Sequence, residues 1–260
     1  MKSQLSAWKV GGPDDDHGLM TSVQKALAVL KTVSECSVPP RIAEIAIKTG
    51  ISRPTAYRIV RALIAEGYLV QDAHSGRLSI GFSVLSLSAS ILDQNRLRLE
   101  ALPHLQSLAL LAEERVNLGI LHRNRVLYLA GIEKPSLPAI YTRFGKTAPA
   151  HCCSLGKAIL AHLPQAELHA LLASEPLVAY TPHSITSMPH FMEELQAARH
   201  KGYATDREEH VVGSYCLATP IFDSASRPIG AIGFSGRALE PLLEHVKVLR
   251  DTAELISHVL

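Results

Sequence analysis

The sequence of 260 residues lacks the features that mark several protein classes. It has four cysteines and no Cys-x-x-Cys pair, so neither a disulfide framework nor a zinc finger is indicated. It also has no run of about 20 apolar residues and no basic-then-apolar leader, which argues against a transmembrane helix and a secretory signal. We therefore expect a cytoplasmic protein with reduced thiols.

A large excess of charge is also missing, since the net charge is only +2. Lys and Arg nevertheless concentrate in one region, because residues 21–80 hold eight of them against four Asp or Glu. A basic segment on an otherwise nearly neutral chain suits a protein that attracts phosphate locally without being a polycation. The apolar content of 47% is enough for sizeable cores, and the length favours two domains.

The basic segment has the order of a winged helix-turn-helix. Apolar periodicity predicts a first helix over 21–33, a support helix over 41–49 and a recognition helix over 53–66, with Gly50 in the turn. Short strands at 68–70 and 78–80 flank a Gly-containing hairpin loop that would form the wing. On the wing, His74 and Arg77 either meet phosphate or are ordinary solvated residues, and the sequence leaves both readings open.

The recognition helix is predicted to have two different faces. Its apolar face consists of Ala56, Ile59, Val60 and Leu63. The opposite face carries arginines, whose planar guanidinium groups offer two parallel donors to phosphate or to guanine. A surface helix with solvated charges is the alternative, but the turn and the wing favour DNA reading. The predicted DNA-binding residues are Ser52, Arg53, Pro54, Thr55, Tyr57, Arg58, Arg61, His74 and Arg77.

The rest of the chain predicts a second domain of α+β class. We expect a flexible tail at 1–20, the winged helix-turn-helix domain at 21–81, a linker helix at 82–96 and the second domain at 97–260. In this second domain, strands are predicted at 116–121, 126–129, 139–143, 203–206, 216–222 and 229–235. Helices lie between them, and a closing helix is expected over 241–259. A mixed antiparallel sheet flanked by helices is typical of a sensor domain.

Several motifs in order resemble the IclR family of bacterial transcriptional regulators across about residues 21–259. These motifs are SVQKAL, TGISRPTAYRIVRALIAEGYL, ALPHLQSLA, HCCSLGKAILAHLP and GYATDREEHVVGSYCLATPIFDSASRPIGAIGFSG. The resemblance implies a winged-helix DNA-binding domain, a linker helix and a GAF-like effector domain. It also implies a repressor or activator that forms homodimers or homotetramers, binds operator DNA and responds to small organic acids, aromatic catabolic metabolites among them.

The resemblance further suggests where an effector binds. Free N–H groups at the start of the helix after Cys153 favour an anion, and in the family the matching amides hold the effector carboxylate. Gly233 replaces a frequent Ser, which is expected to leave space and to favour an aromatic or longer acid. Lys157, in the same helix, is expected to be solvated. The predicted effector-binding residues are Ser154, Leu155, Gly156, Asp206, Cys216, Gly233, Ser235, Leu118 and Tyr141.

Two other function classes draw on the same region. The parts of a nucleophilic Cys-His-Asp set are Cys152, Cys153, His151, His210 and Asp206. The same cysteines and histidines, with Cys216, suggest a metal or redox sensor, although adjacent cysteines do not easily bind one zinc ion. We expect no enzymatic activity, no cofactor and no metal, with the cysteines as small buried hydrophobes. A thiol- or metal-dependent sensor and a Cys-His hydrolase remain the alternatives.

Overall fold

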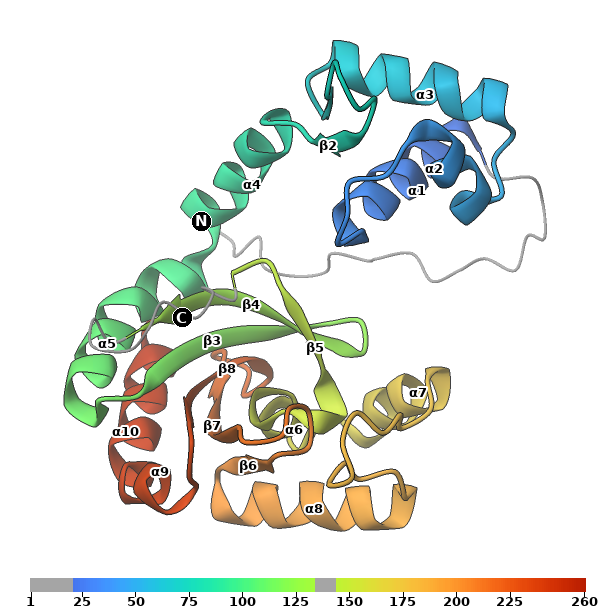
Figure 1. Ribbon diagram of the computed structural model, residues 1–260. Helices are drawn as coiled ribbons and strands as arrows, with labels where there is room; N and C mark the ends of the chain where they lie inside the picture. The colour runs from blue at the N-terminus through green and yellow to red at the C-terminus, as the bar shows by residue number, and fades with distance from the viewer. Residues whose placement is uncertain (1–20, 134–143) are drawn as a thin grey trace. The chain divides into compact units, whose positions relative to one another are not determined.

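The computed structural model describes residues 21–133 and 144–260. These residues divide into two compact units, one ending at Ser90 and the other beginning at Ile91. Figure 1 shows that the first unit consists of helices with a small hairpin and that the second is built on a larger sheet. Within the described ranges, no helix is long and apolar enough to cross a membrane.

The N-terminal unit is a winged helix-turn-helix. Its elements are α1 (Ser22–Glu35), α2 (Ile42–Thr49), α3 (Arg53–Ala65), β1 (Leu69–Gln71) and β2 (Leu78–Ile80). Thr21 starts α1 with a capping box, because its hydroxyl accepts from the Gln24 N–H while the Gln24 side chain accepts from the Thr21 N–H. Gly50 ends α2 with a φ of 68°, which glycine adopts without strain, so the chain turns directly toward α3.

An apolar cluster holds the N-terminal unit together. Ala56 and Val60 of α3 are fully buried in it against Ile45 of α2, as their helical spacing predicted. The hairpin adds Leu78, whose N–H donates to the Pro40 carbonyl at 2.8 Å and so ties the wing to the loop before α2. Removing these side chains from water is the main stabilising contribution in so small a unit.

Two consecutive helices follow the hairpin, α4 (Ser83–Gln94) and α5 (Arg96–Ala112). Asn95 separates them and caps α5, since its side chain accepts from the Arg98 N–H at 2.9 Å. Pro103 lies inside α5, which begins seven residues earlier at Arg96. None of the residues of α4 is buried in the described chain, which leaves the apolar side chains of this helix accessible.

The C-terminal unit contains a six-stranded antiparallel sheet with the strand order β5-β4-β3-β8-β7-β6. Its strands are β3 (Arg115–His122), β4 (Arg125–Ile132), β5 (Thr147–Pro149), β6 (Ala204–Arg207), β7 (Tyr215–Phe222) and β8 (Pro228–Gly236). Strands β3 and β8 pair at the centre, with Asn117 opposite Gly233. Strand β6 is outermost and places Asp206 opposite Cys216. The strand expected at 139–143 lies outside the described residues.

Helices cover both faces of this sheet. One face packs against α5 and α10 (Val246–His258), where Leu118 and Phe234 are buried. The other face packs against α6 (Ser154–Leu160), with α8 (Met188–Lys201) beyond it. The remaining helices are the 3₁₀ turn η1 (Ala150–Cys152), α7 (Gln165–Ser174) and α9 (Glu240–Glu244). This arrangement is the predicted α+β class.

The closing helix differs from the prediction, because the chain forms two helices where one was expected over 241–259. The break is at His245, whose N–H donates to the Leu242 carbonyl in a tight turn before α10 begins. The His245 ring packs against Phe234 of the sheet, with ring centroids 5.7 Å apart. A packing contact of this kind leaves no trace in apolar periodicity.

Candidate functional site

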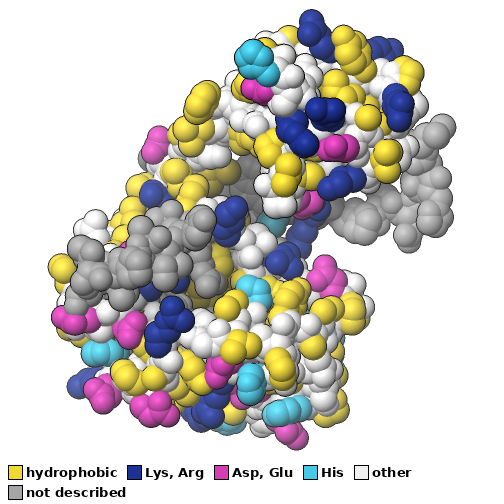
Figure 2. All heavy atoms as spheres, in the orientation of Figure 1, with side chains coloured by type: hydrophobic (Ala, Val, Ile, Leu, Met, Phe, Trp, Pro, Cys, Tyr) yellow, Lys and Arg dark blue, Asp and Glu magenta, His cyan; other side chains and the backbone are white. Residues whose placement is uncertain are grey.

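The outer face of α3 presents cationic and aromatic side chains to solvent. Arg53, Arg58 and Arg61 are exposed and make no hydrogen bond or ion pair with any described residue. Tyr57 lies among them with 55% of its surface exposed. Figure 2 shows Lys and Arg side chains gathered over the N-terminal unit. Guanidinium groups without a protein partner are free to bind phosphate oxygens or base edges.

The residues at the start of α3 are arranged differently from the expectation for a cap. Ser52 occupies the N-cap position, but its hydroxyl donates to the Thr55 hydroxyl at 2.9 Å instead of accepting from a backbone N–H. Pro54 is exposed in the first turn, where no helical hydrogen bond is lost. The predicted helix start is therefore correct, but the two hydroxyl groups bind each other.

The two wing residues have different surroundings. His74 is exposed at the tip of the hairpin loop. Arg77 is half-buried, and its guanidinium donates to the Pro39 carbonyl at 2.6 Å. Arg77 therefore fastens the wing to the loop before α2, whereas His74 has no such contact among the described residues.

A pocket in the C-terminal unit brings together most of the predicted effector residues. It is lined by Asn117, Tyr128, Cys153, Ser154, Leu155, Asp206, His210, Val211, Ser214, Cys216, Gly233, Phe234 and Ser235. Ser154 and Leu155 are in the first turn of α6, where no helical carbonyl precedes their N–H groups. The free volume is about 10 Å³, which is room for about one water molecule.

Two of the predicted residues that the structure describes, Leu118 and Gly156, do not line this pocket. Leu118 points to the opposite face of the sheet, where it is buried under α5 and α10, because side chains alternate along β3 and its neighbour Asn117 faces the pocket. Gly156 packs against η1, since a Cβ placed there would lie 2.1 Å from the Ala150 carbonyl oxygen. Tyr141 lies outside the described residues.

The expectation that Gly233 leaves space is wrong. A Cβ at this position would lie 2.4 Å from the Leu217 carbonyl oxygen and 2.8 Å from the Ala218 Cβ, so strand β7 already occupies that volume. Gly233 reflects close approach of two strands and provides no room for a larger ligand.

The floor of the pocket is polar. Asn117 Nδ2 donates to Ser235 Oγ at 3.1 Å, and Cys216 Sγ lies 3.3 Å from the same hydroxyl. The side-chain oxygen of Asn117 is buried and accepts no hydrogen bond from the described residues. A buried acceptor of this kind favours a ligand that donates a hydrogen bond to it. Asn117 was not among the predicted effector residues, because a single Asn in a buried strand carries no spacing signal.

Asp206 is the acidic group of the pocket and is only 3% exposed. Burial raises the pKa of its carboxyl to about 7, against the opposing effect of the Glu209 N–H, which donates to Asp206 Oδ1 at 2.8 Å. Near neutral pH, Asp206 therefore switches between a hydrogen-bond donor and an anion, and only the neutral form is compatible with a carboxylate ligand close by.

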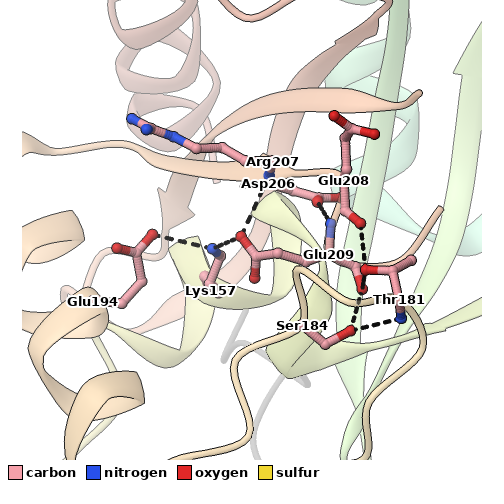
Figure 3. A network of polar contacts seen from close by, with 8 residues as sticks. All are labelled: Lys157, Thr181, Ser184, Glu194, Asp206, Arg207, Glu208 and Glu209. Atoms are coloured by element: carbon pink, nitrogen blue, oxygen red, sulfur yellow. Dashed lines mark hydrogen bonds and ion pairs between the residues drawn. The ribbon is translucent and has the colours of Figure 1, made fainter. Parts of the chain in front are cut away.

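Lys157 is fully buried, although the sequence suggested a solvated residue. Its ammonium donates to Glu209 Oε1 at 2.6 Å and to Glu194 Oε1 at 3.1 Å, as Figure 3 shows. Burial by itself lowers the pKa of Lys157, but the two carboxylates outweigh it and raise the pKa above its ordinary value. The whole of α6 is buried, so no face of this short helix meets solvent. The usual expectation that one face of a helix is polar and solvated therefore fails here.

The alternative chemistries find little support at this site. Burial raises the pKa of the Cys152 thiol to about 12 and that of Cys153 further still, so both thiols are protonated and weakly nucleophilic. His151 Nε2 contacts the Val178 carbonyl at 3.0 Å and not a thiol. Within the described chain, no three His, Cys, Asp or Glu residues converge as metal ligands.

Comparisons with known proteins agree with the fold. Two family descriptions match the chain, "IclR helix-turn-helix domain" over residues 22–73 and "Bacterial transcriptional regulator IclR C-terminal" over residues 89–258. The chain is 33% identical over 243 residues to the glycerol operon regulatory protein of Streptomyces coelicolor, covering 91% of this chain and 94% of that protein. It is 28% identical over 243 residues to the HTH-type transcriptional repressor AllR of Escherichia coli, covering 92% of this chain and 90% of that protein.

A solved structure adds a bound ligand to this comparison. It is an IclR homolog from Microbacterium hydrocarbonoxydans in complex with 4-hydroxybenzoate, and it superposes with a TM-score of 0.76 at 25% identity. The match covers 92% of this chain and 98% of that one.

Proposed function

Because the chain belongs to the IclR family of bacterial transcriptional regulators, we propose that it controls a catabolic operon in response to a small organic acid. Operator DNA is bound by the outer face of α3, and the acid is bound in the pocket at the start of α6. A ligand shifts an equilibrium only through unequal affinity for two arrangements of the protein. Effector binding therefore changes operator affinity through the linker helix α4 and the contacts between subunits.

The chemistry of the pocket carries this proposal. The N–H groups of Ser154 and Leu155 suit a carboxylate, whereas the side-chain oxygen of Asn117 needs a donor. Asp206 in its neutral form adds a second donor beside Cys216. A ligand that is an anion at one end and donates a hydrogen bond at the other satisfies all of these groups. This description fits a hydroxy acid or a hydrated oxo acid.

The size of the pocket narrows the effector class. The free volume of about 10 Å³ holds about one water molecule, and Gly233 adds no room, so any acid must widen the pocket, and a short acid requires less widening than an aromatic ring. An aromatic acid would require a larger outward movement of the pocket wall, which includes His210 and Val211, than a short acid would. We therefore propose a short hydroxy or oxo acid as the effector, in contrast to the 4-hydroxybenzoate bound by the Microbacterium homolog.

A thermal-shift panel tests this proposal, because a ligand that binds only the folded state raises the melting temperature. We expect glycolate and lactate to raise it and 4-hydroxybenzoate to have a smaller effect. Asp206→Ala should abolish the shift while operator binding persists. A larger shift with 4-hydroxybenzoate would contradict the size argument, and no shift with any acid would contradict the effector site itself.

We also propose that the chain works as a homodimer or homotetramer. Helix α4 leaves Leu85, Leu87 and Ile91 exposed by 64%, 58% and 61%, which a second copy of the chain would cover. Light scattering after size exclusion should give a mass of two or four chains, and Leu85→Asp with Ile91→Asp should lower it. A wild-type protein that is monomeric at micromolar concentration would disprove this assembly.

A further inference from the structure

A second, larger hollow lies at the outer edge of the sheet in the C-terminal unit. It runs between α8 and the edge strand β6 and has a volume of about 400 Å³, within the range of small-molecule sites. Its lining is His183, Ile185, His190, Glu194, Ala197, Ala198, Lys201, Tyr203, Ala204, Thr205, Arg207 and Glu209. None of these residues lines the effector pocket, so the two sites are separate. We call this hollow the α8–β6 groove.

The base of the α8–β6 groove is made of small or apolar side chains. Ala198 and Ala204 are buried there, and Ile185 is half-buried beside them. Alanines on both the helix and the strand keep the two elements from filling the space between them. The base therefore suits the methylene groups of a ligand.

The acidic side chains of the groove have ion-pair partners, whereas its exposed basic side chains have none among the described residues. The two carboxylates of the groove, Glu194 and Glu209, are both bound to the buried Lys157 (Figure 3). The cations Lys201 and Arg207 are exposed and have no ion-pair partner among the described residues. The groove therefore offers positive charge to an incoming anion.

The positions of these cations define the length of the ligand. Lys201 ends α8, and the chain reverses at Gly202 into β6, which ends at Arg207. The two cations are thus carried by different elements, and the backbone of β6 from Ala204 to Arg207 spans about 10 Å, three steps of about 3.3 Å. Both cations line the groove, and their long flexible side chains can adjust to the two ends of a ligand of about four to six carbons.

The edge of β6 supplies a neutral donor as well. The Arg207 N–H points away from β7, because it donates to Glu209 Oε1 at 3.4 Å. N–H groups along a strand alternate between its two edges, so the Thr205 N–H also faces outward. Thr205 is one of the residues that line the groove.

From these features we propose that the α8–β6 groove is a second ligand site, which binds a linear dicarboxylate with one carboxylate at Lys201 and the other at Arg207. The methylene chain lies over the alanines of the base. The site does not depend on the proposed function of the effector pocket.

Isothermal titration calorimetry of the full chain with adipate tests the proposal, with hexanoate as the monocarboxylate of equal length. We expect adipate to bind and hexanoate to bind at least tenfold more weakly, because it leaves one cation without a partner. Lys201→Gln and Arg207→Gln should each weaken adipate binding about tenfold. Both side chains are exposed, so the fold should be retained, which circular dichroism checks.

Two controls separate the groove from other sites. Lys247→Gln removes the same charge from an exposed position on α10 and should leave adipate affinity unchanged. Ser235→Ala changes a residue of the effector pocket that does not line the groove, and it should change adipate affinity by less than about twofold. No adipate binding by the wild type, or unchanged binding in both Lys201→Gln and Arg207→Gln, would overturn the second site. Neither result would affect the short-acid test of the effector pocket.

Discussion

Arg58 of α3 and Lys157 of α6 carry the same charge in opposite surroundings. Arg58 is exposed and has no ion-pair partner among the described residues, whereas Lys157 is fully buried and bound to two carboxylates. An exposed cation keeps its hydration and acts on phosphate through a field that salt screens. A buried cation is fixed to its partners and contributes only while both remain. The first arrangement suits binding from solution, and the second holds a site in shape.

The pocket and the groove show the effect of the buried arrangement. Glu209 binds Lys157 through its side chain and Asp206 through its N–H. One residue thus joins the ion cluster to the acid of the effector pocket and also lines the α8–β6 groove. No such connection exists on α3, where each arginine stands alone among the described residues. Changes on α3 should therefore alter one contact each, whereas changes at Lys157 should alter several at once.

The largest change in the free energy of unfolding is expected when the buried cation is removed. Lys157→Met leaves the Glu209 carboxylate buried without its partner, which should cost about 3–5 kcal/mol in the free energy of unfolding. Urea denaturation followed by circular dichroism measures this value. Lys247→Met, an exposed lysine on α10, is the matched control and should change stability by less than about 0.5 kcal/mol. Equal effects of the two substitutions would remove the distinction between buried and exposed cations.

A second effect follows from the raised pKa of Asp206. Its pKa is about 7 in the folded chain and 3.8 as the ordinary value, so the folded state binds a proton more tightly between these limits. Ionisation of Asp206 should therefore reduce stability progressively as the pH rises from about 4 to 7, by up to about 4 kcal/mol. Asp206→Asn should remove this loss and be more stable than wild type at pH 8, with little difference at pH 4.

Urea denaturation of both proteins across this pH range measures the effect. The Asn side chain can still accept from the Glu209 N–H, so the comparison isolates the charge. A stability difference that does not vary with pH would show that Asp206 has an ordinary pKa.

Exposed cations should affect binding and not stability. Arg58→Ala and Arg61→Ala should each weaken operator binding by about 1–3 kcal/mol, and a phosphate contact should lower the salt slope by about 1. Fluorescence anisotropy with an operator fragment at several salt concentrations measures both quantities. Effector affinity should stay unchanged, as should operator binding in the control Lys247→Ala. Unchanged binding in both arginine variants would mean that another surface contacts DNA.

The smallest effect is expected at Arg77 of the wing, which is half-buried and so lies between the exposed Arg58 and the fully buried Lys157. Arg77→Ala removes the hydrogen bond to the Pro39 carbonyl and should cost about 1 kcal/mol of stability. Arg53→Ala, without such a contact, should cost less. Thermal unfolding of the two variants compares them. If Arg77→Ala weakens operator binding without loss of stability, the phosphate-binding reading of the wing is the correct one.

The sequence predicted the features that follow from local patterns, such as the spacing of apolar residues and the position of a turn glycine. Apolar spacing identified the buried side of α3 through Ala56 and Val60, and Gly50 marked the end of α2. Family motifs pointed to Ser154 and Asp206, which the structure brings into one pocket. The domain limits and the roles of these residues stay predictions.

The failures have a common physical cause, which is packing between distant segments. Lys157 was expected in solvent because the turn that follows it has an amphipathic pattern, and only the fold brings Glu194 and Glu209 to it. Gly233 was expected to leave space, but the sequence does not show that strand β7 packs against this glycine and fills the volume. Asn117 became visible as a ligand group only through its buried oxygen.

The Lys157–Glu209 pair also restricts how this sequence can drift. Losing Lys157 alone leaves the buried Glu209 carboxylate without its cation and costs several kcal/mol, and losing Glu209 alone leaves the buried Lys157 with only Glu194. Replacing a buried pair with apolar residues of similar size is often neutral or even stabilising. Whichever residue is replaced first, the route to an apolar pair therefore passes through a destabilised single variant. Single-step substitution cannot easily cross that barrier, so the pair can persist over long divergence without being the most stable solution.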